Sequence, residues 1–291
     1  MSSNALVIEA HSNRGAARLG SGEICAFHFP RRLERPLPGD RIVLDDKGSL
    51  LAVQPRLNEF GRGDPRGRFK AIAANLDRAL IVIAAEPAPS PDLVHRYVAA
   101  ALIQGIKPVI VVNKSDLPCP EQPPFSDLAD LAALDIPIYR CRCRPEPQLD
   151  SLAQEISTGT SLLAGQSGVG KTSLLNALVP DLARQTGQLS RVTGKGTHTT
   201  TSATLHQLPG GAWLVDTPGV WEYGLWVMPS AELARGFPEF ARLDQRCRFR
   251  DCRHLTEPNC AVRAASESGQ IPVGRYHAWT RLLREQQRLG S

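Results

Sequence analysis

No apolar run in this sequence of 291 residues approaches the roughly 18 residues that a membrane-spanning helix requires. The first residues lack the charged segment followed by an apolar stretch that marks a secretory signal. The seven cysteines are an odd number, which argues against a fully disulfide-paired secreted scaffold. These absences predict a cytoplasmic protein with reduced thiols and no membrane partner, and we expect a monomer.

The composition, with 42% hydrophobic and 22% charged residues, is ordinary for a globular protein, and the length predicts a multi-domain chain. Residues 1–62 contain short alternating apolar segments between turn residues, which predicts a small β-barrel. The Arg/Gly-rich segment 60–67 is interpreted as a connector that marks the boundary. Residues 63–225 alternate apolar runs with helix-length segments, the pattern of a parallel sheet covered by helices. Residues 226–291 are predicted to be mainly helical.

The elements of the central α/β domain have approximate bounds in the sequence. Strands are expected at residues 80–84, 109–112, 136–139, 161–164, 203–208 and 212–215. Helices are expected at residues 91–104, 128–134 and 149–156. Three of the strands are followed directly by a nucleotide-binding motif, which is where open α/β sheets bind ligands.

A phosphate-binding loop of the Walker A type follows the strand at 161–164. Its glycines allow backbone N–H groups to surround phosphate oxygens, and the next helix offers its positive N-terminus. We expect Lys171 to reach the β- and γ-phosphates and the Thr172 hydroxyl to bind Mg²⁺. The alternative, a chance glycine turn, is disfavoured by the strand–loop–helix context. The loop residues expected to bind nucleotide are Gly165, Gln166, Ser167, Gly168, Val169, Gly170, Lys171, Thr172 and Ser173.

The tetrapeptide Asn113-Lys114-Ser115-Asp116 indicates a guanine base. The Asp116 carboxylate can accept hydrogen bonds from guanine N1–H and N2–H₂, whereas adenine N1 carries no proton. A site built to hydrogen-bond a substrate group strongly rejects analogues that lack the group. We expect Asn113 to hold the pocket and the Lys114 stem to lie over the ring. With the phosphate loop, the tetrapeptide predicts a protein that binds GTP and GDP.

The motif from Asp216 to Gly219 reads Asp-Thr-Pro-Gly, and it supplies the magnesium side of the site. We expect Asp216 to hold Mg²⁺ through water and the Gly219 N–H to sense the γ-phosphate. Before it lies the polar, Gly-rich segment 194–201, which is suited to ordering around the γ-phosphate. Thr199 or Thr200 is expected to supply a hydroxyl to the metal, and Thr200 is preferred.

The position that orients the attacking water in many GTPases, after the glycine of this motif, is Val220. An apolar side chain cannot polarise water, so we expect slow intrinsic turnover that a bound partner accelerates. His198 is the nearest titratable candidate for the role, and a histidine without any catalytic part is the alternative. The residues expected to act in catalysis are Lys171, His198, Thr200 and Gly219.

The order of the motifs along the chain is the reverse of the usual GTPase order. The base motif at 113–116 precedes the phosphate loop at 165–172, and the magnesium-side aspartate Asp216 follows. These parts can surround one nucleotide only if the domain is circularly permuted. In this order the chain passes from the magnesium side directly into the C-terminal residues.

Cys247, Cys252, His254 and Cys260 lie within 14 residues. Three thiolates and one imidazole form a complete tetrahedral set for Zn²⁺ with no open position, which is typical of one structural zinc. The alternative is three core cysteines and a surface histidine. We expect zinc to stabilise a small domain with little apolar core of its own.

Positive charge gathers in the C-terminal residues 241–291, which contain ten arginines, no lysine and five acidic residues. A second basic cluster spans residues 62–70. Because arginine forks match phosphate geometry, both are candidate nucleic-acid contacts, with a solvated surface as the alternative. Near the C-terminus, apolar residues recur at helical spacing and predict a helix that docks on its own domain. Arg281, Arg284 and Arg288 share another face of this helix.

The order of these motifs, the barrel and the Cys/His cluster resemble one family over nearly the whole chain. The sequence resembles the ribosome small-subunit-dependent GTPase A family (RsgA, also called YjeQ or YloQ), which are bacterial circularly permuted GTPases. Three segments carry much of the resemblance: Gly165–Lys171, Gly196–Thr200 and Asp216–Gly219. Residues 55–58, residues 73–77 and the Cys/His spacing add to it.

The resemblance implies an OB-fold barrel, a permuted P-loop GTPase domain and a zinc domain. It also implies binding to the 30S ribosomal subunit and its 16S rRNA, late in maturation, with hydrolysis stimulated by that subunit. The sequence departs from the family at Thr197, where arginine is usual, and at Cys141-Arg142-Cys143, where Ser-Ala is common. An RNA-binding or scaffold protein with little ribosome-stimulated turnover is the alternative function.

Overall fold

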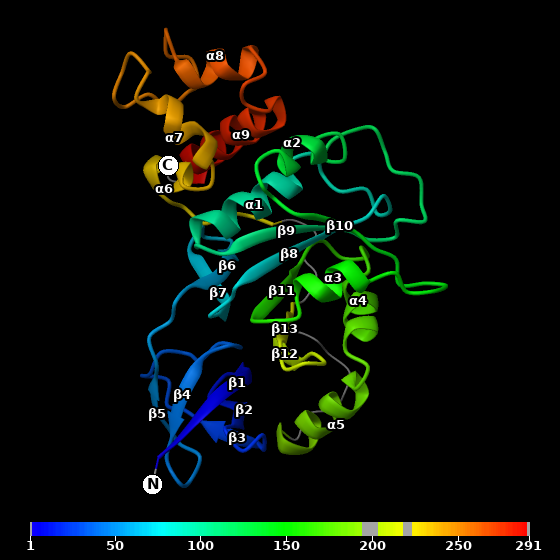
Figure 1. Cartoon of the computed structure of the whole chain (residues 1–291). Helices are drawn as coiled ribbons and strands as arrows, with labels where there is room; N and C mark the ends of the chain where they lie inside the picture. The colour runs from blue at the N-terminus through cyan, green and yellow to red at the C-terminus, as the bar shows by residue number, and fades with distance from the viewer. Residues whose placement is uncertain (1, 194–202, 218–222, 290–291) are drawn as a thin grey trace.

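The computed structural model describes residues 2–193, 203–217 and 223–289. The chain forms an N-terminal strand-rich part, a central sheet covered by helices, and a C-terminal group of helices (Figure 1). This is the architecture that the sequence predicts. Among the described residues, no helix is both long and apolar enough to cross a membrane.

The N-terminal part is an antiparallel sheet with the strand order β3-β2-β1-β4-β5. Its strands are β1 (Ser3–His11), β2 (Arg14–Leu19), β3 (Ile24–His28), β4 (Arg41–Leu44) and β5 (Leu50–Val53). A parallel bridge between His28 and Ser49 joins the two edges of the sheet, so the strands close into a barrel. Val7, Phe27 and Ile42 fill the interior, with at most 2% of each side chain exposed. The predicted barrel is confirmed.

The Arg/Gly-rich segment that the sequence suggested as a connector lies in a β-hairpin, which the sequence analysis did not predict. Strands β6 (Glu59–Gly63) and β7 (Phe69–Ala74) pair antiparallel and form a separate small sheet. Asp64 organises the turn by accepting hydrogen bonds from the backbone N–H groups of Arg66 and Arg68. The expected domain division at 62/63 lies within β6, and it stays a prediction.

Tertiary packing explains why the hairpin forms in spite of its turn-like composition. Phe60 is 2% exposed, and Phe69 packs edge-on against Trp226 with a centroid distance of 4.6 Å. The backbone of the hairpin also bonds to a later segment, through the Gly63 N–H to the Gly224 carbonyl and the Val227 N–H to the Gly67 carbonyl. Because the contacting residues are far apart in the sequence, no local sequence pattern predicts the hairpin.

The central sheet has the order β10-β9-β8-β11-β13-β12, and only β12 runs antiparallel to its neighbour. Its strands are β8 (Arg78–Ile83), β9 (Lys107–Val112), β10 (Ile138–Arg140), β11 (Thr160–Ala164), β12 (Thr204–Gln207) and β13 (Trp213–Asp216). Every strand predicted for this domain is present, with ends that differ by no more than two residues from the expected bounds.

Helices cover both faces of this sheet (Figure 1). They are α1 (Leu93–Ile103), α2 (Leu128–Ala132), α3 (Asp150–Glu155) and α4 (Lys171–Leu178). Along β8, Ile81 and Ile83 pack with α1 and α2, whereas Leu80 and Val82 pack with α3 and α4. A strand buried on both faces reads as a continuous apolar run, which is why the sequence revealed it.

Helix α5 (Leu182–Thr193), which the sequence analysis did not predict, packs against β2 and β3 of the barrel. Gln185 on α5 exchanges two hydrogen bonds with the backbone of Gln207 on β12, at 2.9 and 3.0 Å. Arg18 of the barrel donates to the Gln207 side chain and lies 5.5 Å from the ring centroid of Trp213. The barrel is therefore attached to the β12–β13 edge of the central sheet.

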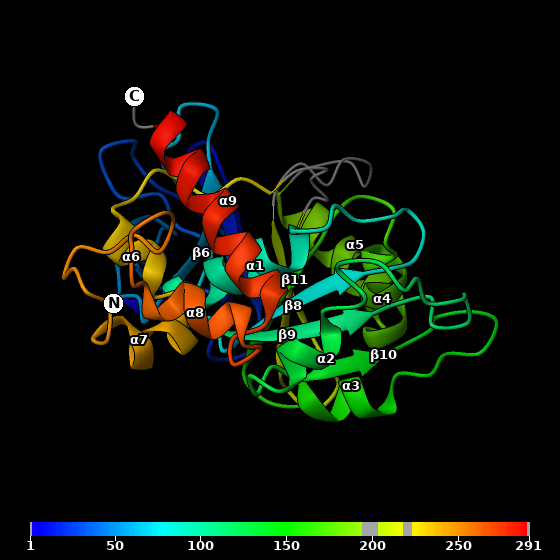
Figure 2. The ribbon, with the colours of Figure 1, turned by 90° about the horizontal axis from the view of Figure 1, so that it is seen from above.

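The C-terminal part contains α6 (Ser230–Ala234), α7 (Pro238–Asp244), α8 (Ala261–Glu267) and α9 (Val273–Leu289). Trp279, Leu282 and Leu283 are each at most 3% exposed, which confirms that the apolar stripe of α9 docks inside its own chain. Helix α9 lies next to α1 (Figure 2), and Arg96 on α1 forms an ion pair with Glu285 on α9 at 2.6 Å. The predicted arginine face of α9 is exposed at Arg281, Arg284 and Arg288.

A buried histidine makes the stability of the fold depend on pH. His206 on β12 is 7% exposed, and its burial lowers the pKa of its imidazole to about 4. An unfolded histidine binds a proton near pH 6.5, so the stability that the neutral ring provides is present above that pH and is lost as the pH falls toward 4. We expect this residue to account for a loss of roughly 3 kcal/mol in the free energy of unfolding over that range.

Urea unfolding at a series of pH values measures this effect. The His206→Gln variant should lose less stability between pH 6.5 and 4 than the unsubstituted protein. His28→Gln, at an exposed position on β3, is the matched control and should retain the original slope. Equal slopes for His206→Gln and the unsubstituted protein would show that His206 does not cause the dependence.

Candidate nucleotide site and metal centre

The predicted motifs meet at the carboxyl edge of the central sheet. The base motif follows β9, the phosphate loop follows β11, and Asp216 is the last residue of β13. The chain order of the strands reverses between the neighbours β8 and β11. In open α/β sheets the ligand crevice lies outside the carboxyl ends of the strands at such a switch point.

Side chains of the base motif bond directly to the phosphate loop. The Asn113 side-chain amide donates to the Val169 carbonyl at 2.9 Å, and Asn113 is 2% exposed. Lys114 Nζ donates to the carbonyls of Gly168 and Glu86, at 3.0 and 2.7 Å. The base motif and the phosphate loop are thus adjacent in space, although they are more than 50 residues apart and occur in the inverted order along the chain. One nucleotide can contact both.

The phosphate loop depends on glycine at two positions. Gly165 has φ 142°, and a Cβ there would lie 2.3 Å from the Val82 carbonyl oxygen. Gly170 has φ 94°, and a Cβ there would lie 2.2 Å from the side-chain nitrogen of Asn113. Helix α4 begins at the next residue, so its free N–H groups face the loop. A larger residue would strain both the turn and its contact with the base motif.

A buried lysine and a half-buried aspartate lie at the centre of the site. Lys171 is 7% exposed, and its Nζ donates to the carbonyls of Gly165 and Gln166, each at 2.8 Å. Burial lowers the pKa of Lys171, and the charge of Asp216 opposes the shift. Burial raises the pKa of Asp216 to about 6, and the charge of Lys171 opposes that shift. Ionisable side chains whose burial is not fully offset by an opposite charge are common at sites that bind a charged ligand.

Neighbouring hydroxyls complete this side of the site. Thr217 donates from its hydroxyl to the Leu163 carbonyl at 2.6 Å, which fixes the chain just after Asp216 against β11. Thr172 is exposed at the start of α4, and Ser173 is half-buried beside it. Thr172 directly follows Lys171, whose charge interacts with that of Asp216, and a hydroxyl and a carboxylate are both suitable oxygen ligands for Mg²⁺.

The base side of the site is built from β9 and β10. The Ser115 N–H donates to the Cys141 carbonyl at 3.0 Å, and the Cys143 thiol donates to the Asn113 side-chain oxygen at 3.7 Å. Asp116 is exposed. The segment Cys141–Cys143, where the sequence departs from the family, therefore lies directly beside the base motif.

The sequence analysis gave no role to the segment from Glu86 to Ala88, which also lies at the site. The Gln166 side-chain amide donates to the Pro87 carbonyl at 3.0 Å, and Lys114 donates to the Glu86 carbonyl. This segment follows β8, the strand next to β11. Its position after a parallel strand was the signal that could have identified it.

Three of the residues expected to act in catalysis, His198, Thr200 and Gly219, lie outside the described residues, as does Thr199. Their roles stay predictions. Lys171 is the expected catalytic residue that the structure describes. The described residues fit a guanine nucleotide with Mg²⁺, because they combine a glycine-dependent backbone loop, a helix N-terminus, a buried lysine and the Thr172–Asp216 ligand pair.

The cysteine cluster is assembled in the C-terminal part. One ligand atom from each of Cys247, Cys252, His254 and Cys260 lies within 4.8 Å of all the others. The Nδ1 atom of His254 lies 3.4 Å from Cys260 Sγ and 3.7 Å from Cys247 Sγ. Three sulfurs and one imidazole nitrogen gathered this closely fit a tetrahedral zinc ion.

Helices α8 and α9 hold the loops of the cluster. The Tyr276 hydroxyl donates to the His254 carbonyl, and the Trp279 indole N–H donates to the Arg253 carbonyl, each at 2.9 Å. The Arg263 N–H, in the first turn of α8, donates to Cys260 Sγ at 3.4 Å. His254 has φ 61°, a left-handed conformation that turns the chain between Cys252 and Cys260. Such contacts orient metal ligands before the metal binds.

The sequence model of the RsgA GTPase family matches residues 53–226. The small ribosomal subunit biogenesis GTPase RsgA of Chromohalobacter salexigens is 43% identical over 264 residues, which cover 88% of this chain and 77% of that protein. The protein of the same name from Bordetella pertussis is 41% identical over 295 residues, which cover 98% of each.

Two solved structures share the fold over nearly the whole chain. YjeQ from Thermotoga maritima is similar with a TM-score of 0.75 and 27% sequence identity, and the match covers 99% of each chain. YloQ, described as a circularly permuted GTPase, is similar with a TM-score of 0.72 and 26% identity, covering 99% of this chain and 96% of that one. The chain therefore belongs to the RsgA GTPase family of circularly permuted GTP hydrolases.

Proposed function

We propose that this protein hydrolyses GTP to GDP and phosphate in the late maturation of the small ribosomal subunit, and that the 30S subunit stimulates its turnover. The bonds from Asn113 and Lys114 to the phosphate loop carry the nucleotide part of the proposal, because they bring a guanine motif and a phosphate motif into one crevice. The names of the relatives from Chromohalobacter salexigens and Bordetella pertussis support the ribosomal part.

Each residue of the site has a proposed task. Asp116 accepts from guanine, and the backbone of residues 165–170 surrounds the phosphates. Lys171 balances negative charge on the phosphates, while Thr172 and Asp216 hold Mg²⁺. When bound, Mg²⁺ supplies positive charge to the phosphate oxygens. His198, Thr200 and Gly219 are proposed to complete the γ-phosphate side.

The Cys/His cluster is proposed to bind one structural Zn²⁺. The four ligands leave no position for water, so the metal would stabilise rather than react. Its place beside the arginine-rich helices suggests that zinc maintains the shape of an RNA-binding surface. OB barrels and basic modules both suit contact with 16S rRNA by shape and backbone charge. A monomer in the cytoplasm is the expected form.

The test is GTP turnover measured with and without purified 30S subunits. We expect 30S to raise the turnover number by roughly tenfold or more, because partner-assisted GTPases gain at least this much from a completed site. The stimulation should weaken steeply with salt, since phosphate contacts release counterions. Purified 50S subunits serve as the control.

Two results would contradict the proposal in different ways. Binding of guanine nucleotide with no effect of 30S on turnover would favour the alternative, an RNA-binding or scaffold protein with little ribosome-stimulated hydrolysis. Equal affinity for GDP and ADP would instead contradict the role of Asp116 in choosing the base.

A further inference from the structure

We propose that Arg62 and Lys70 of the β6–β7 hairpin form a subsite that binds a phosphate group beside the phosphate loop. This phosphate group is the one that follows the β-phosphate. It is either the terminal phosphate of bound GTP or the phosphate released from it. The inference rests on the proposed nucleotide site, and it adds a residue pair that none of the nucleotide motifs contains.

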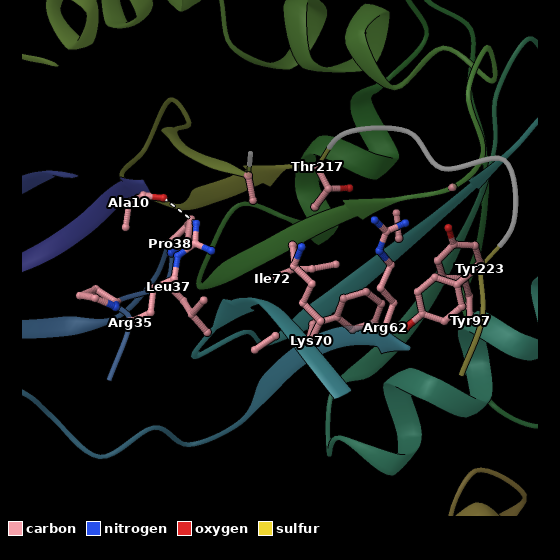
Figure 3. A pocket seen from close by; sticks show the side chains of 16 residues that line it. Ala10, Arg35, Leu37, Pro38, Arg62, Lys70, Ile72, Tyr97, Thr217 and Tyr223 are labelled. Atoms are coloured by element: carbon pink, nitrogen blue, oxygen red, sulfur yellow. Dashed lines mark hydrogen bonds between the residues drawn. The ribbon is translucent and has the colours of Figure 1, made fainter. Parts of the chain in front are cut away.

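The pair lies at a cavity between the hairpin and the central sheet. Arg62 and Lys70 are direct cross-strand partners, so their side chains emerge from the same face of the hairpin. Both line a cavity of about 180 Å³ that also includes Gly165, the first residue of the phosphate loop, and Thr217, which directly follows Asp216. Figure 3 shows the two cationic side chains rising from the hairpin toward Thr217.

Within the part of the chain that the structure describes, the positive charge at this cavity is not balanced. Among its described lining residues, Arg35, Arg62 and Lys70 are cations and none is a carboxylate. Arg35 donates to the Ala10 carbonyl at 3.0 Å, away from the loop (Figure 3). Arg62 and Lys70 form no ion pair within the described part of the chain. A cavity with one sign of charge concentrates ions of the opposite sign.

An adjoining cavity reaches the next residue of the loop. Arg62 and Lys70 line it together with Gln166. Its lining also includes Arg96 and three described carboxylates, and each carboxylate forms an ion pair with an arginine other than Arg62. Asp64 pairs with Arg68, and Asp92 and Glu285 both pair with Arg96. Among the described residues, no carboxylate pairs with Arg62 or Lys70, and the two cations line one cavity with Gly165 and the other with Gln166.

Two tyrosines connect the strand of Arg62 to the loop. The Tyr223 hydroxyl donates to the Gly61 carbonyl, and its ring stacks on Tyr97 with a centroid distance of 4.1 Å. Burial raises the pKa of both tyrosines. For Tyr97, a backbone contact with Gly165 and the charge of Arg62 partly oppose this rise. The strand that carries Arg62 is thus connected through Tyr223 and Tyr97 to the region of the loop.

Phosphate is the anion that suits this pair. A guanidinium presents parallel N–H groups that match two phosphate oxygens, and a lysine adds a point charge. The neighbouring phosphate loop binds the phosphates next to the nucleoside. Arg62 and Lys70 are therefore placed to bind the phosphate beyond these, either while negative charge develops on it or after it is released. Cations in such positions stabilise the transition state or the leaving phosphate.

The test uses the full-length variants Arg62→Gln and Lys70→Gln, with Arg66→Gln as the matched control. Arg66 is exposed at the turn of the same hairpin and lines neither cavity. Calorimetry would measure three affinities: for GDP, for a non-hydrolysable GTP analogue, and for inorganic phosphate added to the GDP complex. Thermal melting of each variant would establish that it is folded.

We expect both hairpin variants to bind GDP like the unsubstituted protein. A loss of about tenfold in affinity for the analogue would assign the subsite to the terminal phosphate of GTP. A similar loss confined to inorganic phosphate would assign it to the released product. Arg62→Lys should recover part of the loss, because it restores charge without the planar fork.

The inference would be overturned if folded Arg62→Gln and Lys70→Gln variants kept all three affinities within about twofold of those of Arg66→Gln. That result would leave the nucleotide site itself intact. Failure of the unsubstituted protein to bind GDP would instead contradict the proposed function.

Discussion

Replacing Lys171 with alanine is expected to lower GTP turnover by about 100-fold or more. The lysine is 7% exposed and is held between the carbonyls of Gly165 and Gln166, so its charge acts inside the loop with little screening by water. Charge that develops on the phosphates would lose the cation that the phosphate loop supplies. Single-turnover hydrolysis at saturating enzyme separates this effect from nucleotide affinity.

Lys47→Ala is the control for this substitution, because Lys47 is exposed in a turn of the barrel far from the loop in sequence. The control should hydrolyse GTP at the original rate. A Lys171→Ala rate within tenfold of the control would argue against the assigned role. Melting curves of both variants would test whether loss of the two hydrogen bonds from Lys171 also weakens the fold.

Replacing Cys260 with alanine is expected to abolish stoichiometric zinc and to destabilise the C-terminal part by several kcal/mol. Cys260 is 3% exposed, its ligand atom belongs to the four-residue cluster, and it is the N-cap residue of α8. Structural zinc converts binding free energy into folding free energy, so losing one ligand of four affects both. Metal content by mass spectrometry and thermal unfolding would measure the change.

Cys119→Ala is the matched control, since Cys119 is an exposed thiol outside the cluster. It should retain one zinc per chain and the original melting temperature. A strong chelator should reproduce the Cys260→Ala behaviour in the unsubstituted protein. Unsubstituted protein that is folded and contains no zinc would contradict the metal assignment.

The sequence predicted the central sheet well because its strands are buried on both faces. Runs such as 80–83 and 109–112 are apolar without interruption, and the second ends where the base motif begins. Such a signal is local, because burial on both sides demands apolar residues at every position. The Cys/His cluster was visible for a similar reason, since its four ligands lie within 14 residues.

Two elements escaped the sequence analysis because distant contacts stabilise them. The β6–β7 hairpin has a composition typical of a turn, and it forms because Phe60 and Phe69 pack against residues after 222. Helix α5 is amphipathic, and its partner is the barrel at the other end of the sequence. Neither partner can be identified from the local sequence.

The chemistry of the site was determined by the sequence itself, because a phosphate loop, a base motif and a set of metal ligands each act through a few adjacent residues. Only the tertiary structure decided which of these parts meet. The sheet order places β9 and β11 on either side of β8, and this brings Asn113 to Val169 in spite of the inverted chain order. Tertiary packing also brings Arg62 and Lys70 to a cavity that they share with Gly165. The sequence could not predict this, because the distance between two segments along the chain does not determine their distance in space.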